Sequence, residues 1–444
     1  MTSTGGSSFL QSHAQLHFDF EWQNPGGARG EELRATWASL AIRIDDTPIT
    51  ELLDRRTRSV RTQVYLPLYP LAEWLATNWW FLKAETEHPQ DTDRDFDRRH
   101  NLRWAREGFA LPSLRIVTFG SHFELQWDRL DIPDAGIQFL ASGQSWLSAP
   151  ELDHSLRNFV NAVVTRLDDM GVARTTLHDE WEAVQNANRE EQEFCHASAR
   201  LGVDPYSTND SLESEIVKVA ATVRPELLDD LLALTTIANL QSNAANLNDA
   251  ARRIATDVDN VDAFADVRKR LSPIENNGNP WETGYRFAST SRAILGGGDW
   301  KSHSVEDLAG YLGIDHLERC LLPDFDECKV IDALVGTNQH GNPKILIQKK
   351  RSDSRQFAFC RAIFEHLTLP SGVFAAVSKL RTERQQMSRA FAAEFLAPHQ
   401  RLKNDLSGAL VYGDEVDDLA DAYGVSAFVI RHQIENHRLA RVTP

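Results

Sequence analysis

The stretch Arg355-Gln-Phe-Ala-Phe-Cys-Arg-Ala-Ile-Phe-Glu-His-Leu367 decides how the last third of this 444-residue chain is interpreted. Its apolar side chains recur at the spacing of one helical face, at Phe357, Cys360, Phe364 and Leu367. Arg361 and Glu365 lie four positions apart and so share another face. One interpretation is an ordinary core helix with this charged pair at the surface, where such a pair contributes about 0.3–0.5 kcal/mol.

A second segment, Phe391-Ala-Ala-Glu-Phe-Leu-Ala-Pro398, follows about two dozen residues later. Together the two segments resemble the ImmA/IrrE family of metallopeptidases. In that family a His-Glu-x-x-His helix precedes a Phe-Ala-x-x-Leu-Leu-x-Pro segment. The resemblance extends to an expected strand at 341–348 and to an expected closing helical pair at 414–436, and it covers roughly residues 330–444.

The positions that carry the chemistry of the family hold other residues here. The resemblance places Arg361 and Glu365 at the two family histidines, Ala362 at the general-base glutamate and Gln385 at the third zinc ligand. A guanidinium group has no lone pair to offer a metal ion. The resemblance therefore implies a catalytically inactive pseudopeptidase with no catalytic residue, metal or other cofactor. Such a protein is expected to bind a protein partner as a regulator, sensor or adaptor, in stress response or phage defence.

Two other functions stay open. One is an active zinc endopeptidase that cleaves a repressor or partner protein with ligands not apparent from the sequence. The other is a DNA-binding transcriptional regulator, because Leu419-Ala-x-x-Tyr-Gly-Val-Ser426 has the spacing of a helix-turn-helix. Its second helix offers Arg431, His432 and Arg438 to DNA or to a protein partner. Five acidic residues on the first helix and a net charge of −17 disfavour DNA.

Composition is typical of a soluble globular protein, with 42% hydrophobic and 25% charged residues. No apolar run approaches the roughly 18 residues of a membrane span, and no secretory signal is visible at the start of the sequence. The four cysteines form no Cys-x-x-Cys pair, which suits free thiols in a reducing compartment. We expect a cytoplasmic protein with no membrane partner.

The chain is long enough for more than one domain. We predict an α+β fold with a β-rich N-terminal domain at 1–148, a helical domain at 149–275, and a zincin-like, ImmA/IrrE-type domain at 276–444. Alternating patterns predict strands at 17–22, 113–119 and 123–127. A helix from Pro70 to about Glu85 is expected to bury its tryptophans, and 85–103 reads as a solvated loop.

Overall fold

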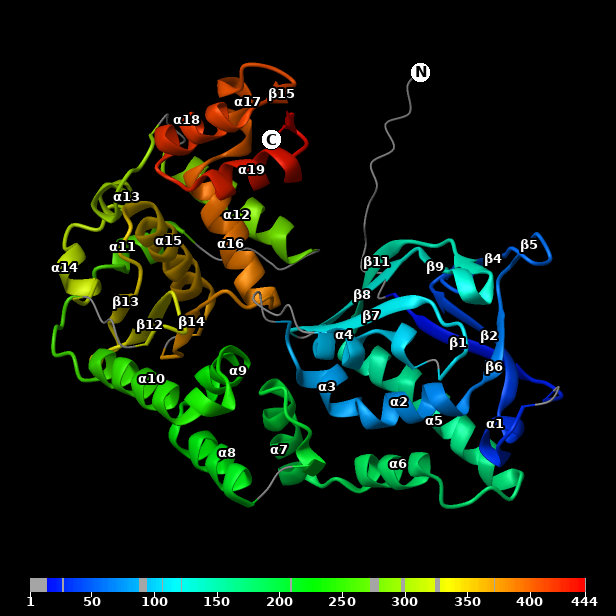
Figure 1. Cartoon of the computed structure of the whole chain (residues 1–444). Helices are drawn as coiled ribbons and strands as arrows, with labels where there is room; N and C mark the ends of the chain where they lie inside the picture. Colours follow the sequence, from blue (N-terminus) through cyan, green and yellow to red (C-terminus); the bar gives the residue numbers. More distant parts are fainter. Residues whose placement is uncertain are drawn as a thin grey trace. The chain divides into compact units, whose positions relative to one another are not determined.

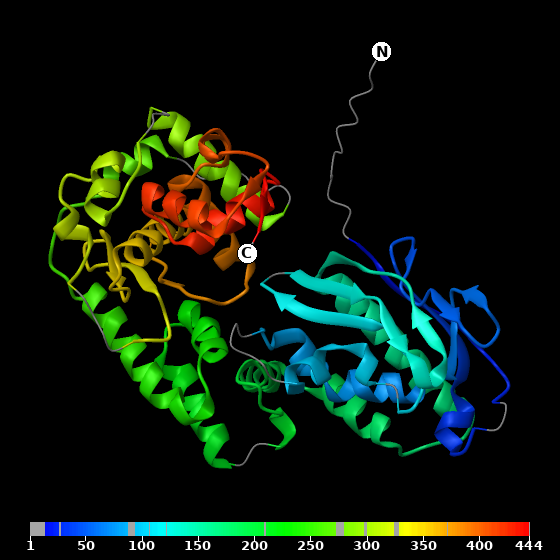
Figure 2. The ribbon, with the colours of Figure 1, turned by 45° about the horizontal axis from the view of Figure 1, so that its top comes forward.

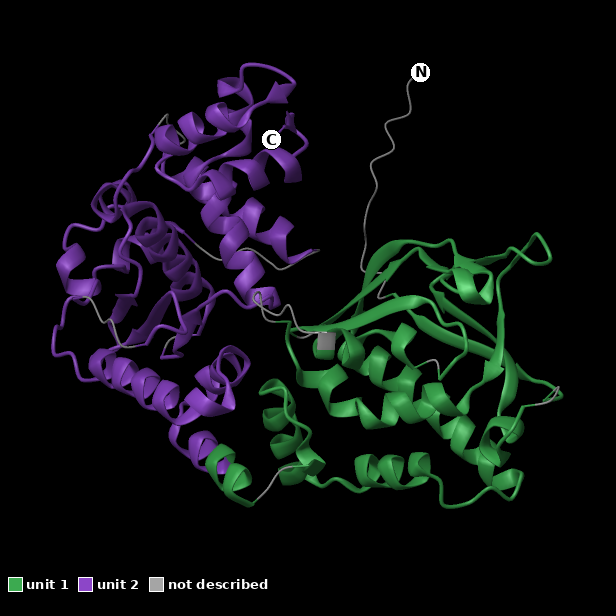
Figure 3. Ribbon diagram, viewed as in Figure 1, with its two compact units in different colours: residues 1–216 green, residues 217–444 purple. Residues whose placement is uncertain are grey.

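The computed structural model describes residues 14–25, 28–87, 94–105, 107–120, 122–207, 210–271, 279–296, 300–323, 328–370 and 372–443 (Figure 1). The chain divides into two compact units, Met1–Ile216 and Val217–Pro444 (Figure 3). Helices and small, mostly antiparallel sheets occur in both, so the fold is α+β, as predicted. Among the described residues, no helix has the length and apolar content to cross a membrane.

The described strands of unit 1 form three antiparallel sheets. The first contains β1 (Leu16–Trp22), β2 (Trp37–Ile44), β3 (Thr47–Pro48) and β6 (Val64–Pro67). The second has the order β5 (Ser59–Arg61), β4 (Leu52–Asp54), β10 (Ile137–Phe139) and β9 (Leu130–Ile132). The third has the order β11 (Gly143–Ser148), β8 (His122–Asp128) and β7 (Ser113–Phe119). The three predicted strands correspond to β1, β7 and β8 and are confirmed.

Helices pack against the first and the third of these sheets (Figure 2). They are α1 (Glu31–Ala35), α2 (Tyr69–Thr77), α3 (Trp79–Ala84), α4 (Arg94–His100), α5 (Ala149–Asp169), α6 (Thr176–Asn186) and α7 (Arg189–Arg200), with short 3₁₀ turns at Leu102–Trp104, Pro133–Ala135 and Pro205–Ser207. Trp79, Trp80 and Phe81 are buried, as predicted, whereas Trp74 is half-buried. Trp79 is fully enclosed and meets Trp181 edge to face at 5.0 Å. Phe159 of α5 packs on Phe18 of β1 at 4.6 Å.

The prediction of a solvated loop at 85–103 is wrong for its second half. Residues 94–100 form α4, whose last residue, His100, is fully buried. Its ring lies 3.0 Å from the carboxylate of Glu85, which also accepts a hydrogen bond from Arg99 at 2.8 Å. The charged residues that suggested solvent exposure form ion pairs here, between Arg99 and Glu85 and between Arg103 and Asp97. Residues 88–93 lie outside the described residues.

The described part of unit 2 consists mainly of helices around a three-stranded antiparallel sheet. The sheet has the order β13 (Pro343–Ile347), β12 (Ala333–Thr337) and β14 (Ala375–Val377). The helices are α9 (Pro225–Leu234), α10 (Leu240–Ala255), α11 (Ala265–Arg270), α12 (Pro280–Ile294), α13 (Val305–Leu312), α14 (Leu317–Cys320), α15 (Ser352–Thr368), α16 (Glu383–Leu396), α17 (His399–Asp405), α18 (Gly413–Tyr423) and α19 (Ala427–Asn436). A 3₁₀ turn at Ile237–Asn239 and the parallel pair β15 (Leu410–Val411) and β16 (Arg441–Val442) complete it.

Two glycines determine how the helices of this unit are arranged. Gly284 lets α12 lie directly on α16, because a Cβ atom there would meet the backbone oxygen of Met387 and would lie 2.9 Å from the Cβ of Ala390. Gly424 ends α18 in the left-handed conformation, at φ 64°, and Val425 and Ser426 lead into α19. The predicted Gly-Val-Ser turn is therefore confirmed.

The helical segment expected at 149–275 is shared between the two units. Helices α5 to α7 pack in unit 1, where α5 contacts β1, β11 and α2. Helices α9 to α11 belong to unit 2, and α8 (Asp210–Thr222) runs across the division at residue 216. The division therefore falls at neither of the boundaries proposed from the sequence, after 148 and after 275. Most of the expected linker at 272–280 lies outside the described residues.

Candidate functional site

Helix α15 carries two charged residues into the interior of unit 2. Its neighbours on the core side are apolar, and it packs against the sheet and against α16. Arg361 is only 3% exposed and Glu365 is fully buried. A pair at the surface, the simpler interpretation of the sequence, is therefore wrong. Burying a charged group is costly unless it is paired and hydrogen-bonded, so the partners of these two residues decide what the site can do.

The guanidinium group of Arg361 is held by α16 and by the chain that leads into it. It donates hydrogen bonds to the backbone oxygen of Ser378 at 2.9 Å, to Oγ of Ser388 at 3.2 Å and to Oε1 of Gln385. Asp332 supplies the opposite charge at 3.6 Å. Burial lowers the pKa of Arg361 to about 10, and Asp332 opposes that change, so the group stays cationic at neutral pH.

Gln385 is itself fixed on every side. Its Oε1 also accepts a hydrogen bond from the backbone N–H of Ser378 at 2.9 Å, and its Nε2 donates to the backbone oxygen of Ala376 at 2.7 Å. This side chain is fully buried. Its carbonyl oxygen therefore has two donors already, one of them the Arg361 guanidinium.

Glu365 pairs with Arg384, not with Arg361 as the sequence suggested. Nη1 of Arg384 lies 3.0 Å from Oε2 of Glu365, and the other arm of Arg384 pairs with Asp230. Neither carboxylate oxygen of Glu365 has a hydrogen-bond partner of good geometry among the described residues. Burial raises the pKa of the Glu365 carboxyl, and Arg384 opposes the rise. Helix α16 thus supplies the partners of both charged residues of α15.

Three of the four positions singled out by the resemblance therefore lie together. Arg361, Glu365 and Gln385 belong to one buried polar network, whereas Ala362 packs into the hydrophobic core of unit 2. Arg384, Asp230 and Asp332 complete this network and were missed in the sequence. Arg384 precedes Gln385 and could have been considered, but Asp230 comes from α9, over 150 residues away, and only the fold brings it there.

A cavity of about 210 Å³ adjoins the network. Glu365 and His366 of α15 line it with Arg268, Thr337 and Pro370, among others. Nε2 of His366 lies 2.8 Å from Nη1 of Arg268, and because the arginine can only donate, the imidazole accepts and is neutral. Burial lowers the pKa of His366 to about 4, and the nearby Arg268 charge adds to that effect. The residues that line the cavity therefore include a buried carboxyl group, a neutral imidazole and a cation.

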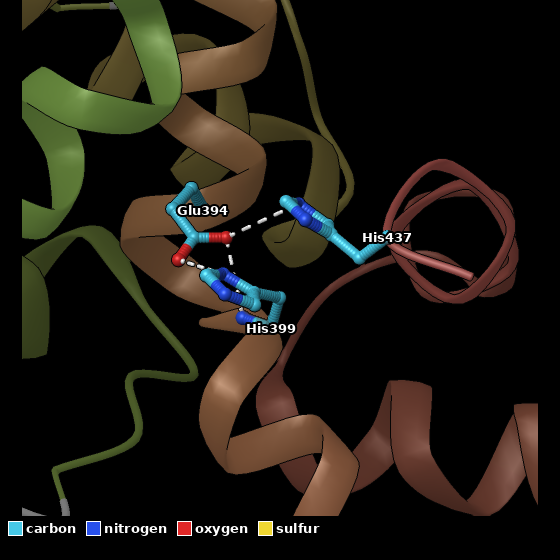
Figure 4. Close-up of side chains that lie close together, drawn as sticks. All are labelled: Glu394, His399 and His437. Carbon is cyan, nitrogen blue, oxygen red and sulfur yellow. Dashed lines mark hydrogen bonds and ion pairs between the residues drawn. The ribbon is translucent and has the colours of Figure 1, made fainter. Parts of the chain in front are cut away.

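A second cluster, also missed in the sequence, lies where α16, α17 and α19 meet (Figure 4). Oε1 of Glu394 lies 2.7 Å from Nδ1 of His399, and Oε2 lies 3.7 Å from Nε2 of His437. Hydrogen bonding to Glu394 raises the pKa of His399, whereas burial lowers the pKa of His437. The five-residue spacing from Glu394 to His399 was a visible signal, but His437 joins them only through the fold of the terminal helices.

The three residues proposed for DNA or partner contact lie on or just after α19. Arg431 and Arg438 are exposed, and His432 is half-buried against the ring of Phe428 at 4.2 Å. The preceding helix presents four exposed aspartates, at Asp414, Asp417, Asp418 and Asp421. Whether these residues contact DNA or a protein partner stays a prediction. Comparisons with protein-family models, with curated proteins and with solved structures find no match for this chain.

Proposed function

We propose that residues 276–444, within unit 2, form a pseudopeptidase domain of the ImmA/IrrE type, which binds a protein partner as a regulator, sensor or adaptor and does not cleave it. The observation that carries the proposal is the buried guanidinium of Arg361, bonded to Gln385. In the resemblance these two residues stand at two zinc-ligand positions, and here they satisfy each other.

The electrostatics of the network support the absence of peptidase chemistry. A divalent cation at this place would have to approach the charges of both Arg361 and Arg384 in a buried site, where like charges repel strongly. Glu365 is the one anionic residue among the four positions, and Arg384 already pairs with it at 3.0 Å. Ion pairs to Arg361 and Arg384 hold the acidic residues of the network, Asp332, Asp230 and Glu365, so a carboxylate that activates a water molecule would first have to leave an arginine.

The cavity beside Glu365 is the part of this site that suits recognition. It combines apolar and glycine-lined walls with Arg268, Glu365 and His366, a mixture typical of sites that bind a ligand segment by shape and a few polar contacts. A peptide segment with a basic or hydroxyl side chain fits the Glu365 carboxyl group in its lining.

Zinc analysis tests the inactive assignment. A full chain carrying both His399→Ala and His437→Ala lacks the imidazoles of the second cluster, so any zinc retained must bind elsewhere. We expect no zinc in this variant and no peptidase activity in the wild type. About one zinc per chain in the double variant, lost on adding Glu365→Gln, would show that the network is a metal site after all.

Partner capture tests the recognition role. Thr337→Arg places a long cationic side chain at the cavity, whereas Thr222→Arg makes the same change at an exposed position of α8 in unit 2. From cells that naturally produce the chain, the wild type and Thr222→Arg are expected to retain one specific protein at its full length, and Thr337→Arg to lose it. Recovery of that protein in cleaved form, or equal capture by all three proteins, contradicts the proposal.

A further inference from the structure

Glu394, His399 and His437 bring three potential metal ligands together from three helices of unit 2 (Figure 4). Glu394 lies in the last turn of α16, His399 is the first residue of α17, and His437 follows the last residue of α19. One ligand atom of each lies within 4.8 Å of the others. The cluster lies at the other end of α16 from Gln385 and shares no residue with the Arg361 network.

We propose that Glu394, His399 and His437 bind one Zn²⁺ ion. One carboxylate and two imidazoles are a ligand set that zinc prefers, with the fourth position left to a water molecule. Bond lengths of about 2.0–2.1 Å in a tetrahedron place ligand atoms roughly 3.3 Å apart. Oε1 of Glu394 lies 2.7 Å from Nδ1 of His399, and Oε2 lies 3.7 Å from Nε2 of His437, so each carboxylate oxygen faces one imidazole at a distance close to that value.

His437 gives an independent reason to expect a ligand. Its Nε2 is buried and has no hydrogen-bond partner among the described residues, and it faces Oε2 of Glu394. Buried polar atoms in folded proteins are nearly always bonded. A metal ion between this nitrogen and the carboxylate would satisfy the nitrogen, while Tyr285 holds the ring at a centroid distance of 4.7 Å.

The surroundings of Glu394 fit the outer shell of a metal site. Its carboxylate accepts hydrogen bonds from Nε2 of Gln433 at 2.9 Å and from the backbone N–H of His399 at 3.2 Å, and Oγ of Ser289 lies 3.4 Å away. Such contacts orient a ligating carboxylate and are a regular part of zinc sites. The side chain of Glu394 is only 3% exposed, so it cannot turn away to solvent.

Two adjustments accompany metal binding. The proton between Nδ1 of His399 and the carboxylate is released, because zinc binds the deprotonated ligands. The two imidazoles are stacked at 4.1 Å with their planes 10° apart, so one ring must turn about its Cβ–Cγ bond before both in-plane lone pairs point at one ion. This rotation leaves the backbone of the three helices in place. The ion then ties α17 and α19 to α16.

Zinc titration of the metal-free full chain tests the site. We expect one ion per chain, a rise in Tm with added zinc, and affinity at least about 100-fold weaker in His399→Ala and in His437→Gln. Gln433→Ala removes only an outer-shell contact and is expected to cost about tenfold. His432→Ala, on the same helix but outside the cluster, serves as the control and is expected to bind zinc like the wild type.

Three results would overturn the site: no zinc-dependent change in the wild-type Tm, equal affinity in the ligand variants and the control, or a loss of affinity as large in His432→Ala. Circular dichroism of each metal-free variant separates loss of a ligand from loss of the fold, and His437→Gln keeps a polar side chain of similar size for that reason. Cobalt(II) provides a second readout, because the wild type is expected to give the visible absorption of four-coordinate cobalt and the ligand variants are not.

Discussion

Arg361 is a cation enclosed by hydrogen-bond acceptors and by Asp332, so its removal leaves buried polar groups without partners. We expect Arg361→Ala to lower the free energy of unfolding of unit 2 by about 3–5 kcal/mol, the usual effect of breaking a buried ion pair. Urea denaturation measures this quantity. Lys269→Ala is the control, since its pair with Asp266 is 76% and 72% exposed and should contribute under about 0.5 kcal/mol. Equal effects of the two substitutions would contradict the buried network.

The lowered pKa of His366 makes the stability of unit 2 decrease as the pH falls. The folded-state pKa of about 4 lies below the ordinary value of about 6.5, so below pH 6.5 the unfolded chain binds more protons. Stability from this group is complete above pH 6.5 and is lost as the pH falls toward 4. Unfolding by urea at pH 7 and pH 5 should show a larger loss in the wild type than in His366→Gln. An identical loss in both proteins would show that His366 is not held neutral.

The charged residues of the site could be predicted only in part. Motif spacing places Arg361, Glu365 and Gln385 near one another, because a helical turn and a family frame fix their relative positions. The same reasoning pairs Arg361 with Glu365, and that is wrong because Arg384 and Asp332 are closer opposite charges. Such partners come from segments whose approach depends on the whole fold. Side-chain pairing in a buried network is therefore not readable from local spacing.

The contact between α12 and α16 depends on the absence of one side chain. A Cβ atom at position 284 would meet backbone atoms of α16, which cannot give way like the end of a flexible side chain. We expect Gly284→Ala to destabilise unit 2 by about 1–3 kcal/mol through overpacking. Gly310→Ala in α13 is the matched control, because no atom lies within 4 Å of its added methyl group. Alanine favours the helix there by about 0.5–1 kcal/mol, so thermal melts should move in opposite directions. Parallel shifts would contradict the proposed close contact.

Elements with a clear hydrophobic periodicity were predicted correctly, whereas α4, whose composition is mostly charged, was not. The alternation in β1, β7 and β8 reflects one buried face, and Gly424 marks a helix end through its left-handed conformation. Helix α4 was missed because its seven residues carry six that are charged or histidine, and composition alone suggested solvent exposure. Arg99 and His100 at the end of this helix contact Glu85, a residue outside the helix, and local composition does not reveal such contacts.

The division of the chain into units depends on packing that composition does not reveal. The sequence changes character after residue 148, from alternating to helical periodicity, yet α5 covers strands of unit 1 and shares their core. A change of secondary structure therefore does not mark a change of compact unit here. The division at residue 216 falls within α8, where neither periodicity nor linker composition gives a signal.

The net charge of the whole chain affects its affinity for nucleic acid. With a formal charge of −17 and exposed aspartates on α18, the chain should show little affinity for duplex DNA at physiological salt. A mobility-shift titration over a range of salt concentrations measures this affinity. Replacing Arg431, His432 and Arg438 with alanine is expected to change nothing, because the net charge and the exposed aspartates of the preceding helix already disfavour the approach of a phosphate backbone. If they did contact phosphates, each loss would reduce the salt dependence by roughly one unit of slope. Tight, sequence-specific binding that these substitutions abolish would make transcriptional regulation the better explanation of the terminal helices.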